Sequence, residues 1–302
     1  MDLSVAIRNR TMKNPVGLAS GTSGYGSEYE DLIPMGEVGC IYTKAITANP
    51  RAGNDVPRIV ETPSGLLNSI GLANVGVDDF LREKAEFLHR FHGSPAVVAN
   101  VAGSTPEEYV AVIERLEEAD FLFGYEVNLS CPNVKHGCLA FGTDPRHVER
   151  LVSMLRGLTD RPLIVKLTPN VTDITLIARA AESGGADAVS CINTLVGMVI
   201  NIEKKRPVFA AGTGGLSGPA IRPVGVAAVY RIAKVVGIPV IGMGGIMEGP
   251  DAVQYLLAGA RAVQIGTGIF VDPGSPKRIL DYIETYGREN GFNSISDFHG
   301  HF

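Results

Sequence analysis

The residues PVIGMGGIMEGPDAVQYLLAGARAVQIGTG (239–268) decide the fold of this chain. A short apolar run, Pro239–Met243, is followed by a glycine-rich turn. Gly249-Pro250-Asp251 then marks a helix start, because proline suits the first helical turn and an acid suits its positive end. A second apolar run, Ala262–Gly266, follows the helix. The stretch therefore predicts a strand–helix–strand unit with two parallel strands.

Six similar runs precede this unit in the chain. Each is short and apolar, as expected for parallel strands that are buried on both faces. Strands that alternate with helices in this way favour a closed (β/α)₈ TIM barrel of the α/β class. The eight predicted strands are Val16–Ser20, Cys40–Lys44, Val97–Val101, Tyr125–Leu129, Leu163–Leu167, Ala188–Ile192, Pro239–Met243 and Ala262–Gly266.

Three segments do not belong to a minimal barrel. Leu3–Lys13 predicts a small hairpin that closes the bottom of the barrel. Ile46–Asn74 and Asn193–Ser217 are too long for ordinary loops, and we expect the second to carry its own strands. Both follow the carboxyl ends of strands, where barrel enzymes build their active sites. We expect residues 1–302 to form a single domain with these insertions.

Composition restricts the class of protein. The chain has 302 residues, of which 45% are hydrophobic, and a net charge of −5, so no basic excess indicates a nucleic-acid or anionic-membrane partner. It shows neither a signal peptide nor an apolar stretch of the roughly 18 to 20 residues that spans a bilayer. The four cysteines form no CxxC pair and read as free thiols of a reducing compartment. We expect a cytoplasmic protein.

Polar residues stand at the ends of six predicted strands. A single one could be a buried structural hydrogen bond, but six at equivalent positions indicate a ring of ligand contacts. Glycines follow the last two strands, at Gly242–Gly245 and Gly266–Gly268, where backbone N–H groups can approach a phosphate. Simple turn chemistry is the alternative, and no GxGxxG fingerprint supports a dinucleotide site. The six polar residues are Ser20, Lys44, Asn100, Asn128, Lys166 and Asn193.

Cys131 is the strongest candidate for chemistry. It lies in Asn128-Leu129-Ser130-Cys131-Pro132-Asn133, directly after the fourth strand. A thiol accepts a proton when its surroundings favour the thiolate. A lone cysteine is more often a core residue, but the loop position of Cys131 argues against that role.

This motif resembles the active-site motif of class 1 dihydroorotate dehydrogenases. Three further stretches, at 68–74 (NSIGLAN), 191–194 (CINT) and 242–246 (GMGGI), also resemble that family. The resemblance extends from about Leu3 to beyond Gly291. It implies a TIM barrel that binds FMN and oxidises dihydroorotate to orotate in pyrimidine synthesis. Cys138 departs from the pattern, which has a second glycine beside Gly137, and this puts the mobility of the loop in doubt.

The resemblance also implies roles for individual residues. Cys131 is the base that takes a proton from C5 of dihydroorotate, on the face opposite the flavin. Lys44 serves the substrate carboxylate, and Lys166 lies near the N1/C2=O edge of the flavin. The implied orotate contacts are Lys44, Asn68, Ser69, Ile70, Gly71, Leu72, Asn128, Asn193 and Thr194. The implied FMN contacts are Ser20, Lys44, Ala45, Asn100, Asn128, Lys166, Ile192, Gly218, Gly244, Gly245, Gly266 and Thr267.

The stretch 99–109 (ANVAGSTPEEY) resembles the NAD-linked branch of class 1. In that branch a homodimer of the barrel lies within a heterotetramer, and a second subunit carries FAD and a 2Fe–2S cluster. The fumarate-linked homodimeric branch is the alternative. Class 2 enzymes, which use serine as the base and carry an N-terminal extension, do not match.

Other readings stay open. Dihydropyrimidine dehydrogenase shares the barrel and a similar cysteine motif, but its ferredoxin-like cysteine runs are absent from this sequence. A phosphosugar isomerase or lyase would share only the phosphate loops, and a non-catalytic barrel would not need Cys131 and Lys44. His89 and His92 have a spacing that permits a metal, but no acidic partner is evident, so we expect no metal site.

Overall fold

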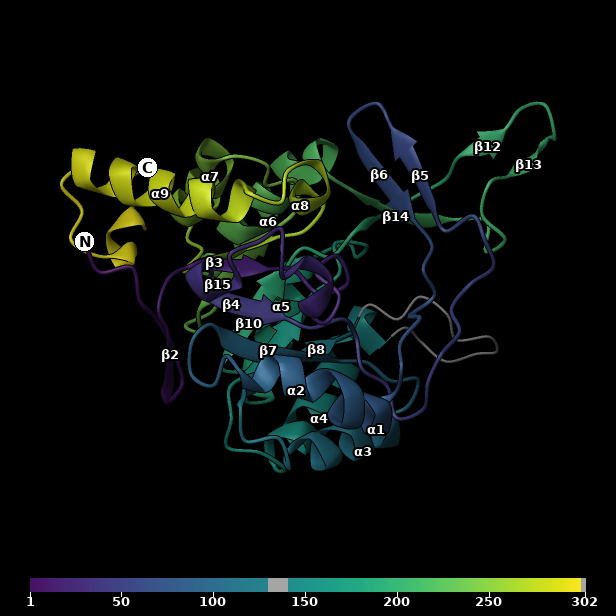
Figure 1. Cartoon of the computed structure of the whole chain (residues 1–302), viewed down its shortest axis with the longest axis horizontal. Helices are drawn as coiled ribbons and strands as arrows, with labels where there is room; N and C mark the ends of the chain where they lie inside the picture. Colours follow the sequence, from purple (N-terminus) through teal and green to yellow (C-terminus); the bar gives the residue numbers. More distant parts are fainter. Residues whose placement is uncertain (130–140, 300–302) are drawn as a thin grey trace.

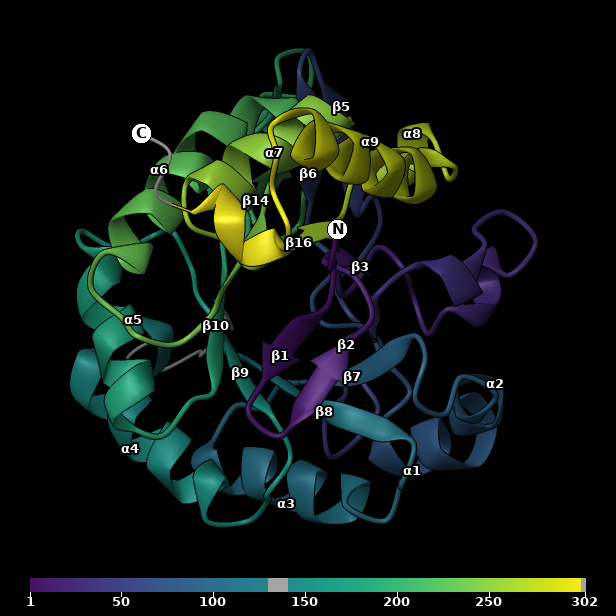
Figure 2. The same ribbon diagram turned by 90° about the vertical axis from the view of Figure 1, so that its left-hand side faces the viewer.

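The computed structural model describes residues 1–129 and 141–299 and contains the predicted closed barrel of eight parallel strands. The strands follow one another around the barrel in chain order, and the last, β16, pairs with the first, β3. Figure 2 shows the helices as a ring outside the strands. All eight predicted strands are confirmed. Their bounds are β3 Val16–Leu18, β4 Cys40–Tyr42, β7 Ala96–Val101, β8 Leu122–Asn128, β9 Leu163–Lys166, β10 Ala188–Cys191, β15 Val240–Met243 and β16 Ala262–Ile265.

The outer helices begin where caps satisfy their first N–H groups. The side chain of Thr105 accepts from the backbone N–H of Glu108, and Asp144 accepts from that of Arg146. Such caps remove unpaired donors at a helix start. The helices are α1 Val77–Asp79 and α2 Ala85–His89, joined by a π turn at Phe80–Lys84, then α3 Pro106–Leu116, α4 Pro145–Arg156, α5 Ile174–Ser183, α6 Arg222–Ala233, α7 Gly249–Leu257, α8 Gly268–Val271 and α9 Ser275–Glu289. No helix within the described ranges is both long and apolar enough to cross a bilayer.

The first connection differs from the expected helix-per-strand pattern. Between β3 and β4, a stretch that is described in full, the chain forms only the 3₁₀ turns Ser27–Tyr29 and Met35–Glu37. Gly24 and Gly26 have positive φ angles of 57° and 92°, and Pro34 precedes the second turn. A helix cannot continue through left-handed residues, so this unit is shorter than the others.

The predicted N-terminal hairpin is present and lies across one end of the barrel (Figure 2). Its strands, β1 Val5–Ile7 and β2 Arg10–Met12, pair in antiparallel fashion. The Arg10 guanidinium donates to the carbonyl oxygens of Leu122 and Phe123, at 2.5 and 3.1 Å. These carbonyls belong to the start of β8, so the hairpin closes the amino-terminal end of the barrel.

The two long insertions meet in one antiparallel sheet at the other end (Figure 1). Its strand order is β11-β14-β6-β5, so the two strands of the second insertion lie side by side and β14 pairs with β6 of the first insertion. A separate hairpin, β12–β13, extends farther out (Figure 1). The expected strands after Asn193 are confirmed, but their pairing with the earlier insertion was not predicted. The bounds are β5 Ile59–Thr62, β6 Gly65–Asn68, β11 Leu195–Gly197, β12 Ile200–Asn201, β13 Arg206–Pro207 and β14 Gly214–Ser217.

Replacing Arg10 with alanine tests the closure by the hairpin. The change removes the Arg10 donor from both strand carbonyls, although Arg161 Nη1 still reaches that of Leu122 at 3.5 Å. We expect it to lower the free energy of unfolding by about 1–3 kcal/mol. Arg8→Ala is the control in the same hairpin. Arg8 forms ion pairs with Asp160 and Asp187 while 35% of its side chain is exposed, so its loss should cost less than about 1 kcal/mol. Equilibrium urea unfolding measures both, and equal effects would contradict the account.

Candidate active site

Lys166 is almost completely shielded from solvent at the carboxyl end of β9. Its side chain is only 6% exposed. The ammonium donates to Ser20 Oγ at 3.0 Å and lies 3.7 Å from Glu126 Oε2. The predicted strand-end residues Ser20 and Lys166 therefore meet across the mouth of the barrel, although they come from its first and fifth strands.

Asn100 of β7 is fully buried and keeps one polar atom unused. Its backbone N–H donates to Thr43 Oγ1 at 3.1 Å, and its Nδ2 donates to Glu126 Oε2 at 2.6 Å. The side-chain oxygen Oδ1 is buried without a hydrogen-bond partner among the described residues. A buried acceptor without a partner is costly, so Asn100 is suited to receive a hydrogen bond from a ligand.

The glycine turns after β14, β15 and β16 lie against one another. A Cβ at Gly245, where φ is 70°, would lie 2.6 Å from the Gly218 carbonyl oxygen. Thr267 Oγ1 donates to Ser217 Oγ at 2.7 Å. At Gly266 a Cβ would meet only ordinary contacts, beginning at 3.6 Å from Ala19 Cβ. The protein's own packing therefore does not demand glycine at 266, and the bare backbone there leaves room for a ligand.

The antiparallel sheet joins the two stretches that were predicted to bind substrate. Asn68 pairs with Gly215 in the register of β6 and β14, and its Nδ2 donates to the Gly215 carbonyl at 3.2 Å. A Cβ on Gly215 would lie 2.1 Å from Thr194 Oγ1, so Thr194 packs against the same backbone. Asn193 Oδ1 accepts from the Thr194 N–H at 2.8 Å. Asn68, Asn193 and Thr194 thus form one wall of the predicted substrate site.

The remainder of the predicted substrate stretch has a tightly turned backbone. Gly71 and Leu72 both have positive φ angles, 72° and 57°. Ser69 Oγ already accepts from Asn54 Nδ2 at 3.0 Å. Ile70 is partly exposed and follows Ser69 into this turn. These residues continue the stretch that begins at Asn68.

Lys44 is a partly buried cation after β4. Burial lowers the pKa of its ammonium, an effect that the Glu28 carboxylate opposes and Arg58 reinforces. The ion pairs and side-chain hydrogen bonds among residues 1–129 and 141–299 leave its Nζ without a partner. Such a cation is suited to an anionic ligand. Two more predicted cofactor contacts, Ala45 and Ile192, are buried beside strand ends.

Asn128 is the last residue of β8, just before the predicted catalytic loop that contains Cys131 and Cys138. The Asn128 carbonyl accepts from Tyr109 O–H at 2.8 Å. Cys131 and Cys138 lie outside the described residues. The flanks of the loop touch, because a Cβ on Gly142 would lie 2.8 Å from the Leu129 carbonyl oxygen.

The two described cysteines are poor candidates for a base. Cys40 and Cys191 are free and buried. Burial raises the pKa of Cys40 well above its ordinary value and that of Cys191 to about 12. Neither thiol would accept a proton readily near neutral pH, so neither competes with Cys131 for the role.

These features fit the flavin that the sequence resemblance implies. The glycine turns offer backbone N–H groups to a phosphate. The Asn100 oxygen can accept from a ring N–H, and Lys166 can donate to a ring carbonyl or stabilise negative charge. The site therefore provides for both ends of FMN within one barrel mouth.

Sequence reasoning missed a buried polar layer beneath the mouth. Glu126, Ser190 and Gln264 are all 0% exposed and lie on three different barrel strands. A usable signal was present, since Glu126 and Gln264 each interrupt an otherwise apolar strand.

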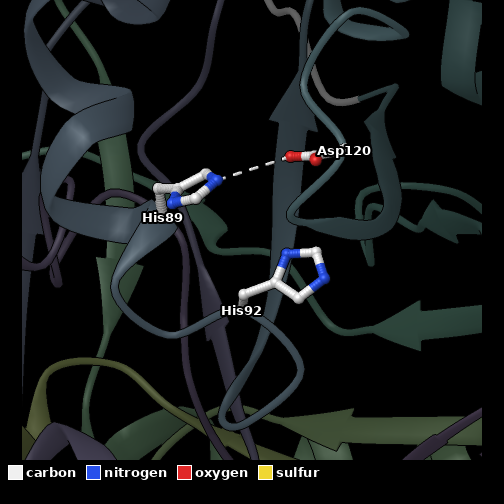
Figure 3. Close-up of side chains that lie close together, drawn as sticks. All are labelled: His89, His92 and Asp120. Carbon is white, nitrogen blue, oxygen red and sulfur yellow. Dashed lines mark ion pairs between the residues drawn. The ribbon is translucent and has the colours of Figure 1, made fainter.

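His89 and His92 have an acidic neighbour, Asp120, so the expectation that no acidic partner lies near them is wrong. His89 Nε2 lies 3.6 Å from Asp120 Oδ1, and His92 is close by (Figure 3). One ligand atom from each residue lies within 4.8 Å of the others, and all three side chains are exposed. His89 ends α2, whereas His92 and Asp120 lie in the turns before β7 and β8, at the end of the barrel opposite the site. Exposed groups often gather in this way without an ion.

Comparison with known proteins agrees with this geometry. The family model described as dihydroorotate dehydrogenase matches residues 2–286. The chain is 50% identical over 299 residues to a protein of Geotalea uraniireducens named dihydroorotate dehydrogenase B (NAD(+)), catalytic subunit. The match covers 99% of this chain and 97% of that protein. A protein of the same name from Geobacter sulfurreducens is 49% identical with the same coverage.

A third protein of that name, from Citrifermentans bemidjiense, is 48% identical over 99% of this chain and 97% of its own length. The family match and these full-length likenesses agree with the barrel, the glycine turns and the strand-end residues. The chain belongs to the dihydroorotate dehydrogenase family and is similar over its full length to catalytic subunits of the NAD-linked branch, class 1B.

Proposed function

We propose that this chain, as one domain over residues 1–302, is the FMN-binding catalytic subunit of an NAD-linked dihydroorotate dehydrogenase. It oxidises (S)-dihydroorotate to orotate in pyrimidine biosynthesis. The observation that carries the proposal is the convergence at one barrel mouth of a buried cation on Lys166, an unsatisfied acceptor on Asn100 and packed glycine turns. The names of the full-length relatives support it.

The cofactor is held by residues from most strands of the barrel. Gly218, Gly244, Gly245, Gly266 and Thr267 receive the phosphate. When bound, FMN supplies a two-electron acceptor for the C6–H bond of the substrate. The residues proposed to hold the rest of the cofactor are Ser20, Lys44, Ala45, Asn100, Asn128, Lys166 and Ile192.

The substrate is oriented by one cation and a set of amides. Lys44 pairs with the carboxylate, which explains an ammonium that has no partner among residues 1–129 and 141–299. The side chains of Asn68, Asn128 and Asn193 each offer a donor and an acceptor to the pyrimidine amides. Thr194 and the backbone of the stretch Ser69–Leu72 complete the wall.

Cys131 removes the proton from C5. A thiolate next to the substrate accepts it on the face opposite the flavin, while the wall of amides prevents rotation of the ring. The described flanks of the segment that carries Cys131, Leu129 and Gly142, lie against each other just beyond the carboxyl end of β8. The position of these flanks supports a role of the thiol at the mouth.

Reoxidation requires a second protein. The relatives are named catalytic subunits, which implies a separate electron-transfer subunit. We propose that this subunit carries FAD and a 2Fe–2S cluster and that two barrels assemble with two such subunits in the cytoplasm. The absence of a dinucleotide fingerprint from this sequence supports an NAD site elsewhere. A fumarate-linked homodimer is the alternative.

Removal of the base should slow the chemical step. We expect Cys131→Ala to retain FMN but to be reduced by dihydroorotate roughly 10² to 10⁴-fold more slowly, the usual worth of a positioned acid or base. Cys131→Ser should also be slow near neutral pH, because a hydroxyl is a weaker base. Stopped-flow reduction measures both. Cys40→Ala, which removes a buried thiol, is the control that should react normally, and a fast Cys131→Ala enzyme would refute the assignment.

The isolated chain should be unable to reduce NAD⁺. With dihydroorotate as donor we expect turnover with an artificial dye but no NADH, because the NAD site belongs to the partner. Adding the electron-transfer subunit should restore NADH formation. Efficient NADH production by the chain alone would rule out the partner model, and good turnover with fumarate would assign the protein to the homodimeric branch.

A further inference from the structure

A fully buried carboxylate, Glu126 of β8, contacts two of the proposed flavin ligands. Its Oε1 accepts from Ser190 Oγ and from Gln264 Nε2, both at 2.8 Å. Its Oε2 accepts from Asn100 Nδ2 at 2.6 Å and lies 3.7 Å from Lys166 Nζ. Burying a carboxylate is costly unless it is hydrogen-bonded and paired. Both oxygens of Glu126 meet that condition through side chains from four other strands.

The carboxylate determines which way the Asn100 amide faces. A carboxylate only accepts hydrogen bonds, so the Asn100 NH₂ group must point toward Glu126. The amide oxygen is thereby turned away from Glu126, and it is the atom that is buried without a partner in the described chain. Glu126 thus presents an acceptor to the mouth, which suits the N–H donor on the pyrimidine edge of a flavin.

The Glu126 carboxylate also forms an ion pair with the Lys166 ammonium. The lysine side chain is only 6% exposed, and Glu126 is the anion with which it forms an ion pair. Burying a cation to this extent costs free energy unless an anion is nearby. Ser20 Oγ takes one N–H at 3.0 Å. Since an ammonium has three donors, Lys166 can still donate to a ligand while it is paired with Glu126.

We propose that Glu126 is a positioning residue of the flavin site, which orients Asn100 and pairs with Lys166 through contacts beneath the cofactor. This inference rests on the proposed binding of FMN. Glu126 does not itself touch the cofactor or the substrate. It acts through two residues that do, so its loss should change the reduction potential of the flavin as well as how tightly it binds.

Two titratable groups of β4, Cys40 and Tyr42, also interact electrostatically with Glu126. Burial raises the pKa of the Cys40 thiol and of the Tyr42 phenol well above their ordinary values. Both therefore stay neutral around pH 7, so neither supplies a charge that would compensate for the loss of the Glu126 carboxylate.

The test replaces Glu126 with glutamine and measures the FMN dissociation constant and the flavin reduction potential between about pH 6 and about pH 9. We expect the dissociation constant to rise about 10- to 100-fold, as a charge-assisted hydrogen bond is lost. The potential should lie above that of the wild type over this range, because the substitution removes a negative charge close to the flavin.

Glu117→Gln is the matched control. Glu117 also accepts hydrogen bonds, from Tyr125 O–H at 2.7 Å and Thr159 Oγ1 at 2.6 Å, but it follows helix α3, outside the mouth of the barrel. The same chemical change there should leave the FMN dissociation constant and the reduction potential as in the wild type. If it reproduces the effects of Glu126→Gln, the proposal is wrong.

A second variant decides the matter if Glu126→Gln does not fold. Glu126→Asp keeps the negative charge but withdraws it by one methylene from Asn100. It should bind FMN more weakly than the wild type, and its potential should run parallel to that of the wild type over the whole pH range. Wild-type affinity for FMN in Glu126→Asp would show that the position of the carboxylate is not required.

Two results with Glu126→Gln would overturn the proposal. One is wild-type affinity and wild-type potentials. The other is weaker binding with a potential equal to that of the wild type, because that pattern would indicate a merely structural role. Failure of the proposed function is a distinct outcome, since folded wild-type protein would then contain no FMN.

Discussion

A carboxylate buried inside a closed barrel is the constraint on which the site depends. Glu126 has 0% exposure, and it is tolerated only because side chains from neighbouring and opposite strands point at it. A slip of one residue in any of these strands would turn the partner side chain to the other face. The polar layer therefore fixes strand register and the positions of Asn100 and Lys166 together, so the fold and the site rest on the same contacts.

The rest of the site is built from segments that the barrel itself does not need. Two insertions, far apart in the chain, pair through β14 and β6 in the sheet β11-β14-β6-β5. That sheet brings Asn68 beside Thr194 through the shared backbone of Gly215. Because β11 follows barrel strand β10 and β14 leads directly into the glycine turn at Gly218, the substrate wall is held relative to the glycine turns. This arrangement agrees with the usual division between a rigid scaffold and functional loops.

Much of this could be predicted from the sequence. The barrel strands are short buried runs with clear boundaries, and Lys166 and Asn100 stood out because polar groups are rare at such places.

The β3–β4 connection was not foreseen, since positive φ angles at Gly24 and Gly26 are properties of the backbone and not of a pattern. The Asp120 neighbour of His89 and the pairing of β6 with β14 depend on contacts distant in sequence, which periodicity does not report. Glu126 could have been found, because a charge within an apolar strand demands partners. Cys131 remains a prediction from its motif.

The central claim is that one barrel mouth binds FMN by its glycine turns and orotate by Lys44, with Cys131 facing the substrate. A crystal structure of the purified protein with orotate tests this most directly. The account predicts the FMN phosphate at Gly245 and Gly266, the orotate carboxylate at Lys44, and the Cys131 sulfur on the side of orotate opposite the flavin. Orotate bound away from Lys44, or Cys131 on the flavin side, would contradict it.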